Sequence, residues 1–403
     1  MNQIKEFSNH SILIIVRDIS SKSAGLSIST FLRARALSLI ENTKVKILTS
    51  SNTLDRADFQ RLNREKINFS LSFYREIVPR IPSIFSIFKI FKDIKNSSII
   101  YIYSFYQPIS YLSFILGKLL KKEIWFRPHG SLMYAYTRNF STLKKIYTYF
   151  ELLIYSSCRY IVLSSNIEKY DFIKFTSKHI LQKTLVEKLR LSTDSFNINK
   201  NDKFFTNNKF NYNHSKRSID IIFLSRLINI KGVSLLLEAL KVLCEDEKFK
   251  SKIYIVIAGI PSKEFTEKYN KYKIIFKKNK YLNIKYKGMV SQSLKWKLLH
   301  DSKYFILPTF GDSFGIAALE ALFSNTKVIS SNKLGCSEII NKLEYFEYID
   351  LSVLSIVNKI KEISNKNRNN SPNNKLIKKF IQDNLSIRNQ CNEYSKIIFE
   401  NNE

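Results

Sequence analysis

The sequence predicts an α/β protein of two domains, each built on its own parallel sheet. Its 403 residues exceed what one ordinary hydrophobic core holds, which favours two domains. Short runs rich in Ile, Val, Tyr and Phe alternate with helical stretches, the pattern typical of parallel α/β units. These runs form two sets, separated by residues 197–218, which are rich in Asn and Lys and have no apolar period.

The two sets of strands are similar in size and predict two Rossmann-like domains. The first set comprises residues 11–16, 45–49, 99–103, 123–126, 160–164 and 187–191. The second set comprises residues 219–224, 253–258, 284–287, 304–307, 327–330 and 346–349. We therefore expect an N-terminal domain over residues 1–200, a C-terminal domain over residues 201–380 and a final segment over residues 381–403. A last helix is predicted over residues 376–400, after the polar stretch 365–374.

The chain is strongly basic, with 65 Lys and Arg against 34 Asp and Glu and a net charge of +31. Such a charge suits nucleic acid or an anionic membrane surface, and it also suits the Lys-, Asn- and Ile-rich composition that an AT-rich genome dictates. No RNA- or DNA-binding signature accompanies the charge, so no nucleic-acid partner is expected. The membrane and compositional interpretations both stay open.

Cysteine usage and hydropathy favour a cytoplasmic protein. The four cysteines lie far apart with no metal spacing, which predicts free thiols in a reducing compartment: Cys158, Cys244, Cys336 and Cys391. The first residues show no secretory signal pattern. Residues 99–120 are apolar, but Gln107, Pro108 and Lys118 interrupt them, so a short strand and an amphipathic helix are predicted there.

The most informative pattern lies between Leu307 and Glu320, where the chain reads LPTFGDSFGIAALE. It predicts a strand end, a turn with two glycines and a helix start, with seven positions between Asp312 and Glu320. Backbone N–H groups at a helix start attract phosphate, and carboxylates accept hydrogen bonds from sugar hydroxyls. The stretch therefore suits a ligand that is part phosphate and part polyol. A solvated Glu320 and a turn-forming Asp312 are the purely structural alternatives.

Arg226 and Lys231 lie between a strand and the helix predicted over residues 233–243. Two cations at a helix start are unfavourable for the helix dipole unless an anion binds between them. An arginine can grip a diphosphate with two hydrogen bonds, and a lysine adds a point charge. The alternative is a pair of ordinary surface cations in a lysine-rich chain.

Four segments in order resemble the retaining glycosyltransferases of family 4. The stretch just described resembles their E-x7-E motif, with Asp312 in place of the first Glu. FLSRL at 223–227 with Lys231-Gly232 resembles the "GR-L…KG" segment, RPHGS at 127–131 resembles the HG segment, and GCSE at 335–338 resembles the "GG-x-x-E" turn. The resemblance implies the GT-B architecture, in which two Rossmann-like domains face each other across a cleft and the last helix crosses back to the first domain.

The resemblance also implies which residues bind the donor nucleotide. Arg226 and Lys231 would hold its diphosphate, and Glu320 would accept hydrogen bonds from its ribose hydroxyls. In the family the first βα turn faces the acceptor and the donor phosphate. Here this turn holds five serines and one glycine, Gly25, whose backbone can still donate hydrogen bonds. An ordinary serine-rich cap and turn is the alternative.

At the reacting sugar the resemblance implies two catalytic residues, His129 and Asp312. His129 would hydrogen-bond the donor sugar at the cleft, and Asp312 would hold the hydroxyls of that sugar. Backbone N–H groups would bind phosphate or sugar at Phe314, Gly315 and Ile316. The chain departs from the family at Asp312, which leaves the donor sugar open. It departs again at Asp194, which ends LSTD where the family often reads N-G-V-D, so only a structural turn is carried over.

Residues 84–92 read IFSIFKIFK, which is aromatic, apolar and basic at helical spacing. Such a helix suits the surface of an anionic bilayer, where it would bring the enzyme to a lipid-linked acceptor. It equally suits a helix packed on a sheet, with its lysines extended towards water.

Together these patterns predict a retaining glycosyltransferase that takes a nucleotide-sugar donor. The acceptor would be a saccharide or lipid-linked, in bacterial surface polysaccharide synthesis such as that of lipopolysaccharide, on the inner face of the plasma membrane. No metal or other cofactor is expected, because the sequence has no D-x-D motif. A GT-B nucleotide-sugar epimerase and a non-catalytic protein that retains the fold are the alternatives. A nucleic-acid binder is a third.

Overall fold

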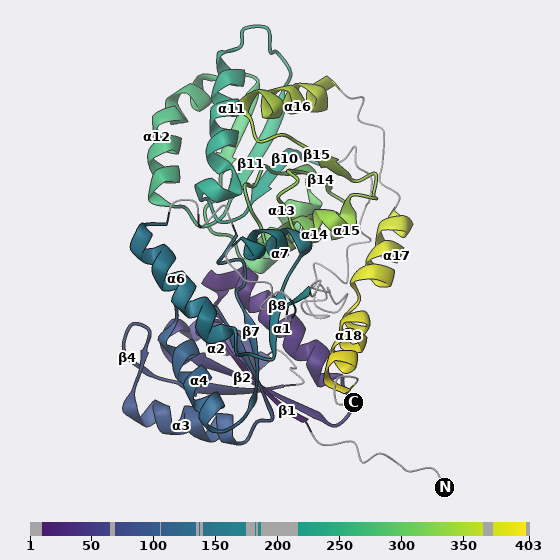
Figure 1. The fold of residues 1–403 in the computed structure, drawn as a ribbon. Coiled ribbons are helices and arrows are strands. Elements are labelled where there is room, and N and C mark those ends of the chain that lie inside the picture. Colours follow the sequence, from purple (N-terminus) through teal and green to yellow (C-terminus); the bar gives the residue numbers. More distant parts are fainter. Residues whose placement is uncertain are drawn as a thin grey trace. The chain divides into compact units, whose positions relative to one another are not determined.

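The structure is a computed structural model that describes residues 10–64, 69–104, 106–133, 137, 140–174, 182, 184–186, 217–365 and 374–399. The chain divides into two compact units. Unit 1 comprises Met1–Leu132, Asn139–Ile198 and Asn384–Glu403, and unit 2 comprises Met133–Arg138 and Asn199–Asp383. Each unit has its own parallel sheet (Figure 1). The expected domain boundaries stay predictions, because residues 187–216 and 366–373 lie outside the described ranges.

Unit 1 is built on a seven-stranded sheet with the order β3-β2-β1-β6-β7-β8-β9, in which every neighbouring pair is parallel. Its strands are β1 (His10–Ile15), β2 (Thr43–Ser50), β3 (Ser70–Tyr74), β6 (Ile99–Tyr103), β7 (Glu123–Arg127), β8 (Tyr160–Leu163) and β9 (Thr184–Val186). A separate antiparallel hairpin joins β4 (Glu76–Val78) and β5 (Ile81–Pro82). The sequence predicted β1, β2, β6, β7 and β8 but missed the others, and its strand over residues 187–191 lies outside the described residues.

Helices cover both faces of this sheet, because alternate strand residues point to opposite sides. One apolar cluster joins the sheet to α3 (Ile84–Lys95), α4 (Pro108–Leu119), α6 (Thr142–Tyr155) and α7 (Asn166–Ile173). The cluster on the other face joins it to α1 (Ala24–Ser38), α2 (Arg56–Arg64) and α18 (Ile387–Phe399). Serine side chains cap three of these helices, at Ser83, Ser141 and Ser165, each accepting a hydrogen bond from a backbone N–H in the first turn.

Unit 2 is built on a six-stranded parallel sheet with the order β12-β11-β10-β13-β14-β15. Counted within the unit this order is 3-2-1-4-5-6, that of the Rossmann fold. All six strands expected from the sequence are present: β10 (Ile219–Leu224), β11 (Ile253–Ala258), β12 (Leu282–Tyr286), β13 (Ser302–Leu307), β14 (Lys327–Ser330) and β15 (Phe346–Tyr348). The predicted class, an α/β protein with a parallel sheet in each of two domains, is therefore confirmed.

The helices that follow these strands are α11 (Val233–Glu245), α12 (Lys263–Lys278), α13 (Gln292–His300), α14 (Ile316–Phe323), α15 (Ser337–Ile340), α16 (Val353–Asn365) and α17 (Asn374–Leu385). The single helix expected over residues 376–400 is wrong, because the structure has two helices there, α17 and α18. Ser386 separates them, and its hydroxyl and carbonyl both accept a hydrogen bond from the N–H of Asn389, which starts α18 afresh.

The apolar segment over residues 99–120 forms β6 and α4, as predicted. In the described part of the chain, no helix is both long enough and apolar enough to cross a bilayer. All four cysteines are free thiols, and Cys158 and Cys336 are buried.

Candidate functional site

The strand order of unit 2 reverses between β10 and β13. From β10 the chain continues to β11 on one side, whereas β13 and β14 extend the sheet on the other. Ligands of open α/β sheets bind outside the carboxyl ends of the strands at such a reversal. The loops that leave these ends are residues 225–232 after β10 and 308–315 after β13. They carry five of the nine residues that the sequence singles out, and Ile316 and Glu320 follow in α14.

Hydrogen bonds hold these two loops together. The N–H of Phe310 donates to the carbonyl of Ile230 at 2.8 Å, and the Thr309 hydroxyl donates to the same carbonyl at 3.0 Å. Gly232 has a φ of +78°, and a Cβ built on it would lie 1.8 Å from the carbonyl oxygen of Pro308. Only glycine allows both the left-handed backbone and this close approach. The glycine of the predicted Lys-Gly pair therefore lets the loops meet.

Lys231 and Asp312 form an ion pair across the two loops. Lys231 Nζ lies 2.6 Å from Asp312 Oδ2 and 3.4 Å from the Gly311 carbonyl oxygen. The lysine side chain is almost fully buried, and the aspartate side chain is 19% exposed. Arg226, in the same loop as Lys231, is exposed. The site therefore holds one fixed cation with its own carboxylate and one cation at the surface.

The turn around Gly315 starts helix α14 without a side-chain cap. Gly315 occupies the N-cap position with a φ of +90°, and no side chain bonds the first turn. The N–H of Phe314 donates to Asp312 Oδ1 at 3.3 Å, whereas Gly315 and Ile316 supply the next two N–H groups at the helix start. Uncapped N–H groups at the positive end of a helix form an anion-binding site.

The loop that follows β14 holds this turn in place through backbone hydrogen bonds. The N–H of Gly335 donates to the Asp312 carbonyl at 2.8 Å, and the N–H of Cys336 donates to the Phe314 carbonyl at 2.6 Å. A Cβ on Gly335 would lie 2.2 Å from the Ser313 carbonyl oxygen, so a larger residue would push the loops apart. The GCSE segment at 335–338 therefore holds the turn that carries Asp312 in place.

Glu320 is buried in α14 and pairs with a lysine that sequence reasoning missed. Its Oε1 lies 2.6 Å from Lys295 Nζ of α13, and the side chains are only 6% and 10% exposed. Glu320 is therefore not a solvated carboxylate of a helix face. The one signal for Lys295 is its position beside Trp296, Leu298 and Leu299 on the buried side of α13. A buried carboxylate held by a cation keeps its charge and direction.

His129 belongs to unit 1 and follows β7 in a left-handed turn. Its φ is +54°, that of Gly130 is +76°, and the His129 side chain is half-buried. Non-glycine residues in this region are uncommon and cluster at functional sites. The buried Glu168 holds the turn, accepting hydrogen bonds from the N–H of Gly130 at 2.5 Å and from the N–H of Ser164 at 2.6 Å.

Gly25 also belongs to unit 1, in the first turn of α1. It is exposed, and a Cβ built on it would meet no atom within 4 Å. The hydroxyls of Ser23 and Ser27 donate to the carbonyl of Ser20 at 3.0 and 2.7 Å. These serines therefore brace the turn itself, whereas the N-cap residue Ser23 makes no side-chain cap hydrogen bond to the helix. Asp194, the last of the motif positions, lies outside the described residues.

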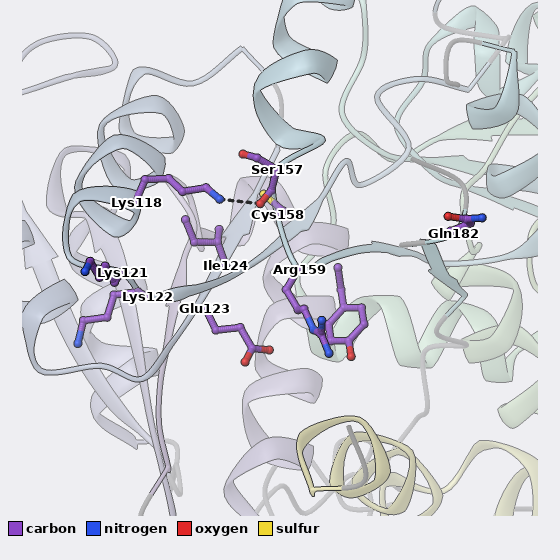
Figure 2. Close-up of a pocket in the computed structure, with 10 residues that line it drawn as sticks. Lys118, Lys121, Lys122, Glu123, Ile124, Ser157, Cys158, Arg159 and Gln182 are labelled. Carbon is purple, nitrogen blue, oxygen red and sulfur yellow. Dashed lines mark hydrogen bonds between the residues drawn. The ribbon is translucent and has the colours of Figure 1, made fainter. Parts of the chain in front are cut away.

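A pocket of about 630 Å³ lies elsewhere in unit 1, beside the amino ends of β7 and β8 (Figure 2). Its lining includes Lys118, Lys121, Lys122, Glu123 and Arg159, and Lys118 Nζ donates to the Ser157 carbonyl at 2.6 Å. None of the predicted site residues lines it. Reaction sites of parallel sheets lie at the carboxyl ends of the strands, so this basic pocket is not the candidate active site.

In the parts of the chain that the structure describes, no three His, Cys, Asp or Glu side chains gather in a way that could hold a metal ion. The expectation of a reaction without metal stays a prediction.

Comparison with known proteins finds a family match over the part of the chain that carries this site. Residues 204–396 match the family model described as "Glycosyl transferases group 1". A search of curated proteins gives no match.

Solved structures show the same fold over nearly the whole chain. HepE of Anabaena, in complex with UDP and glucose, has a TM-score of 0.69 and 12% identity over 96% of this chain and 99% of its own. A glycosyltransferase from Rickettsia africae has a TM-score of 0.66 and 19% identity, covering 98% and 99%. Sucrose-phosphate synthase from Thermosynechococcus elongatus has a TM-score of 0.66 and 13% identity, covering 97% and 98%. The fold of the chain is that of these GT-B structures.

Proposed function

We propose that the protein is a retaining glycosyltransferase that moves a sugar from a nucleotide-sugar without a metal ion. One arrangement carries the proposal. At the carboxyl ends of β10 and β13, two loops that hydrogen bonds and Gly232 hold together carry a partly buried ion pair, and the helix that follows has an uncapped start and a buried carboxylate. These groups match the phosphate and hydroxyl parts of one ligand.

In this proposal the diphosphate of the donor binds Arg226, Lys231 and the first N–H groups of α14. Lys231 and the helix dipole are fixed before the donor arrives, so they stabilise the charge that develops on the leaving diphosphate at little reorganisation cost. Arg226 is exposed and can close on the outer phosphate oxygens with two hydrogen bonds.

Two carboxylates would fix the rest of the donor. Glu320, directed by Lys295, accepts hydrogen bonds from the ribose hydroxyls. Asp312 binds Lys231 through Oδ2, and its Oδ1, which also accepts the N–H of Phe314 at 3.3 Å, would accept hydrogen bonds from the hydroxyls of the transferred sugar. His129, held in its left-handed turn, is proposed to hydrogen-bond the same sugar, and Gly25 is proposed to donate its N–H to the donor phosphate.

UDP-hexoses are the first donors to test. The HepE structures contain UDP, glucose or UDP-glucose, and a trehalose-6-phosphate enzyme of E. coli, also of this fold, was solved with UDP-2-fluoro glucose. For the acceptor we propose a saccharide or a lipid-linked saccharide of bacterial surface polysaccharide synthesis. The reaction would then take place on the cytoplasmic face of the plasma membrane.

The test is a transfer assay with UDP-glucose, UDP-galactose and N-acetylated UDP-hexoses, using lipid-linked and free saccharide acceptors in the presence of EDTA. Proton NMR of the first product reports the anomeric configuration. An α-linked product from an α-linked donor supports the proposal, whereas a β-linked product contradicts retention. Interconversion of the donor without transfer would indicate an epimerase, and donor binding with no conversion would indicate a non-catalytic protein.

A further inference from the structure

Helix α3 of unit 1 turns its phenylalanines outward. Its buried side chains are Ser86, Ile90, Asp93 and Ile94, of which two are polar. Phe85 and Phe88, by contrast, are 87% and 71% exposed. A helix packed on a sheet normally buries its apolar side. Helix α3 does pack on the sheet, through Ile90 and Ile94, but it leaves Phe85 and Phe88 exposed to solvent.

Hydrogen bonds of the polar residues fix this orientation. Asp93 accepts a hydrogen bond from the Ser72 hydroxyl at 2.6 Å and pairs with Lys46 at 2.9 Å. Ser86 accepts from the N–H of Arg75 at 2.8 Å and donates to the Arg75 carbonyl at 3.1 Å. Rotating α3 to bury its phenylalanines would break these bonds and leave a carboxylate without its partners, which is costly.

Other exposed apolar side chains lie beside α3. The hairpin that precedes it is tied to its start by the hydrogen bond from Ser83 N–H to the Arg75 carbonyl, and α4 packs against its side. We call the combined surface the α3 face. Its exposed apolar members are Ile77, Val78, Ile81, Ile84, Phe85, Ile87, Phe88, Phe91, Ile115 and Leu119. Figure 1 shows the hairpin, α3 and α4 as neighbours in unit 1. Contiguous apolar surfaces of this kind mark binding sites.

Every exposed charge of the hairpin and α3 is positive: Arg75, Arg80, Lys89, Lys92 and Lys95. The two acidic residues of this segment are buried and paired, Glu76 with Arg17 at 2.9 Å and Asp93 with Lys46. Burial alone would raise the pKa of Glu76, but hydrogen bonds from Arg17 and from the N–H of Arg80 outweigh burial and lower it. On α4, Lys118 lies exposed beside Leu119.

We infer that the α3 face docks the protein on an anionic lipid bilayer. Phenylalanines and isoleucines would enter the boundary between headgroups and acyl chains, and the surrounding cations would pair with anionic headgroups. A second copy of the chain fits less well, since two such faces would bring like charges together. The link between this face and a lipid-linked acceptor rests on the proposed function. The docking itself is inferred only from the exposed apolar side chains and the positive charges of the α3 face.

The test measures binding of the full chain to sedimented vesicles of phosphatidylglycerol and phosphatidylcholine. We expect binding to anionic vesicles that weakens with added salt. Phe85→Asp/Phe88→Asp and, separately, Lys92→Glu/Lys95→Glu should each weaken it at least tenfold. The matched controls carry the same changes on exposed residues of unit 2, Ile274→Asp/Leu354→Asp and Lys277→Glu/Lys278→Glu, and should bind like the parent.

Three results would overturn the inference. These are no binding of the parent to anionic vesicles, equal loss in face and control variants, and a parent dimer that Phe85→Asp/Phe88→Asp converts to a monomer. UDP-glucose affinity, measured for each variant in solution, separates this inference from the proposed function. Docking variants that keep donor affinity but lose vesicle binding support it. Failure of the parent to bind any donor, with vesicle binding intact, would count against the glycosyltransferase and not against the docking face.

Discussion

Lys231 Nζ lies 2.6 Å from Asp312 Oδ2. The two residues follow the carboxyl ends of β10 and β13, the neighbouring strands between which the strand order of unit 2 reverses. Both residues are predicted to touch the donor, one at the diphosphate and one at the sugar. Under the proposed function, the carboxylate that selects the sugar would also hold the cation that binds the phosphate.

Asp312→Asn should separate binding from transfer. The change leaves the buried Lys231 without its carboxylate, so we expect the free energy of unfolding to fall by about 1–3 kcal/mol. UDP should still bind, because its diphosphate supplies the missing negative charge, whereas sugar transfer should fall at least tenfold. Calorimetric titration with UDP and a transfer assay check this, with the exposed Asp350→Asn as control. Loss of UDP binding together with transfer would contradict the division of roles.

Lys295→Met should weaken donor binding although Lys295 is not proposed to touch the donor. Without its cation, the buried Glu320 loses its fixed direction and its charge becomes costly. We expect a higher KM for the nucleotide-sugar with a smaller effect on kcat, and a lower Tm. The Lys295→Met/Glu320→Gln double variant should lose less stability than the sum of the losses in the two single variants. Lys297→Met, on the exposed side of the same helix, is the control; equal effects of the two lysine variants would refute a positioning role.

Gly232→Ala should be among the most damaging small changes in unit 2. The left-handed backbone costs a side chain about 1–2 kcal/mol, and the Cβ would in addition collide with the Pro308 carbonyl. Gly288→Ala shares the positive φ, but its Cβ would meet only Tyr286 Oη at 3.9 Å, so it isolates the backbone contribution. Gly25→Ala meets nothing and should leave Tm unchanged or slightly raised. Thermal melting curves of the three variants test this. Similar losses of Tm in Gly232→Ala and Gly288→Ala would show that the contact between the loops is unimportant.

Glu151 should make unit 1 less stable as the pH rises towards neutrality. Burial raises the pKa of Glu151 from 4.5 to about 7, although the N–H of Tyr106 donates to its Oε1. Between these values the folded state holds more protons than the unfolded state, so the free energy of unfolding falls with pH, by up to about 3 kcal/mol, and levels off above pH 7. Glu151→Gln should remove this contribution. A stability difference between parent and variant that is constant from pH 4.5 to 7 would contradict it.

The sequence predicts the second unit better than the first, for a physical reason. Strands β10, β11 and β13 each end in a run of buried apolar residues, and the loops that leave β10 and β13 carry the glycines and charges of the motifs. Strand β3 is a short, serine-containing edge strand, and β9 has three half-buried residues, so neither has a strong pattern. Their pairing depends on neighbours distant in the sequence.

Other features could not be predicted because they depend on contacts between distant residues. Nothing local to Lys295 says that it faces Glu320, 25 positions away. The outward rotation of α3 depends on Asp93 meeting Ser72 and Lys46. The sequence of residues 84–92 is compatible with either orientation of the helix, and contacts with residues distant in the sequence determine which one forms.

The most direct test of the donor site is calorimetric titration of the parent chain with UDP and UDP-glucose, repeated for Arg226→Ala and Glu320→Ala. Glu344→Ala, an exposed carboxylate of the same unit, is the control. We expect saturable binding by the parent and the control, and affinity at least tenfold lower in both site variants. Binding that survives both substitutions unchanged would show that the nucleotide-sugar does not bind at the carboxyl ends of β10 and β13.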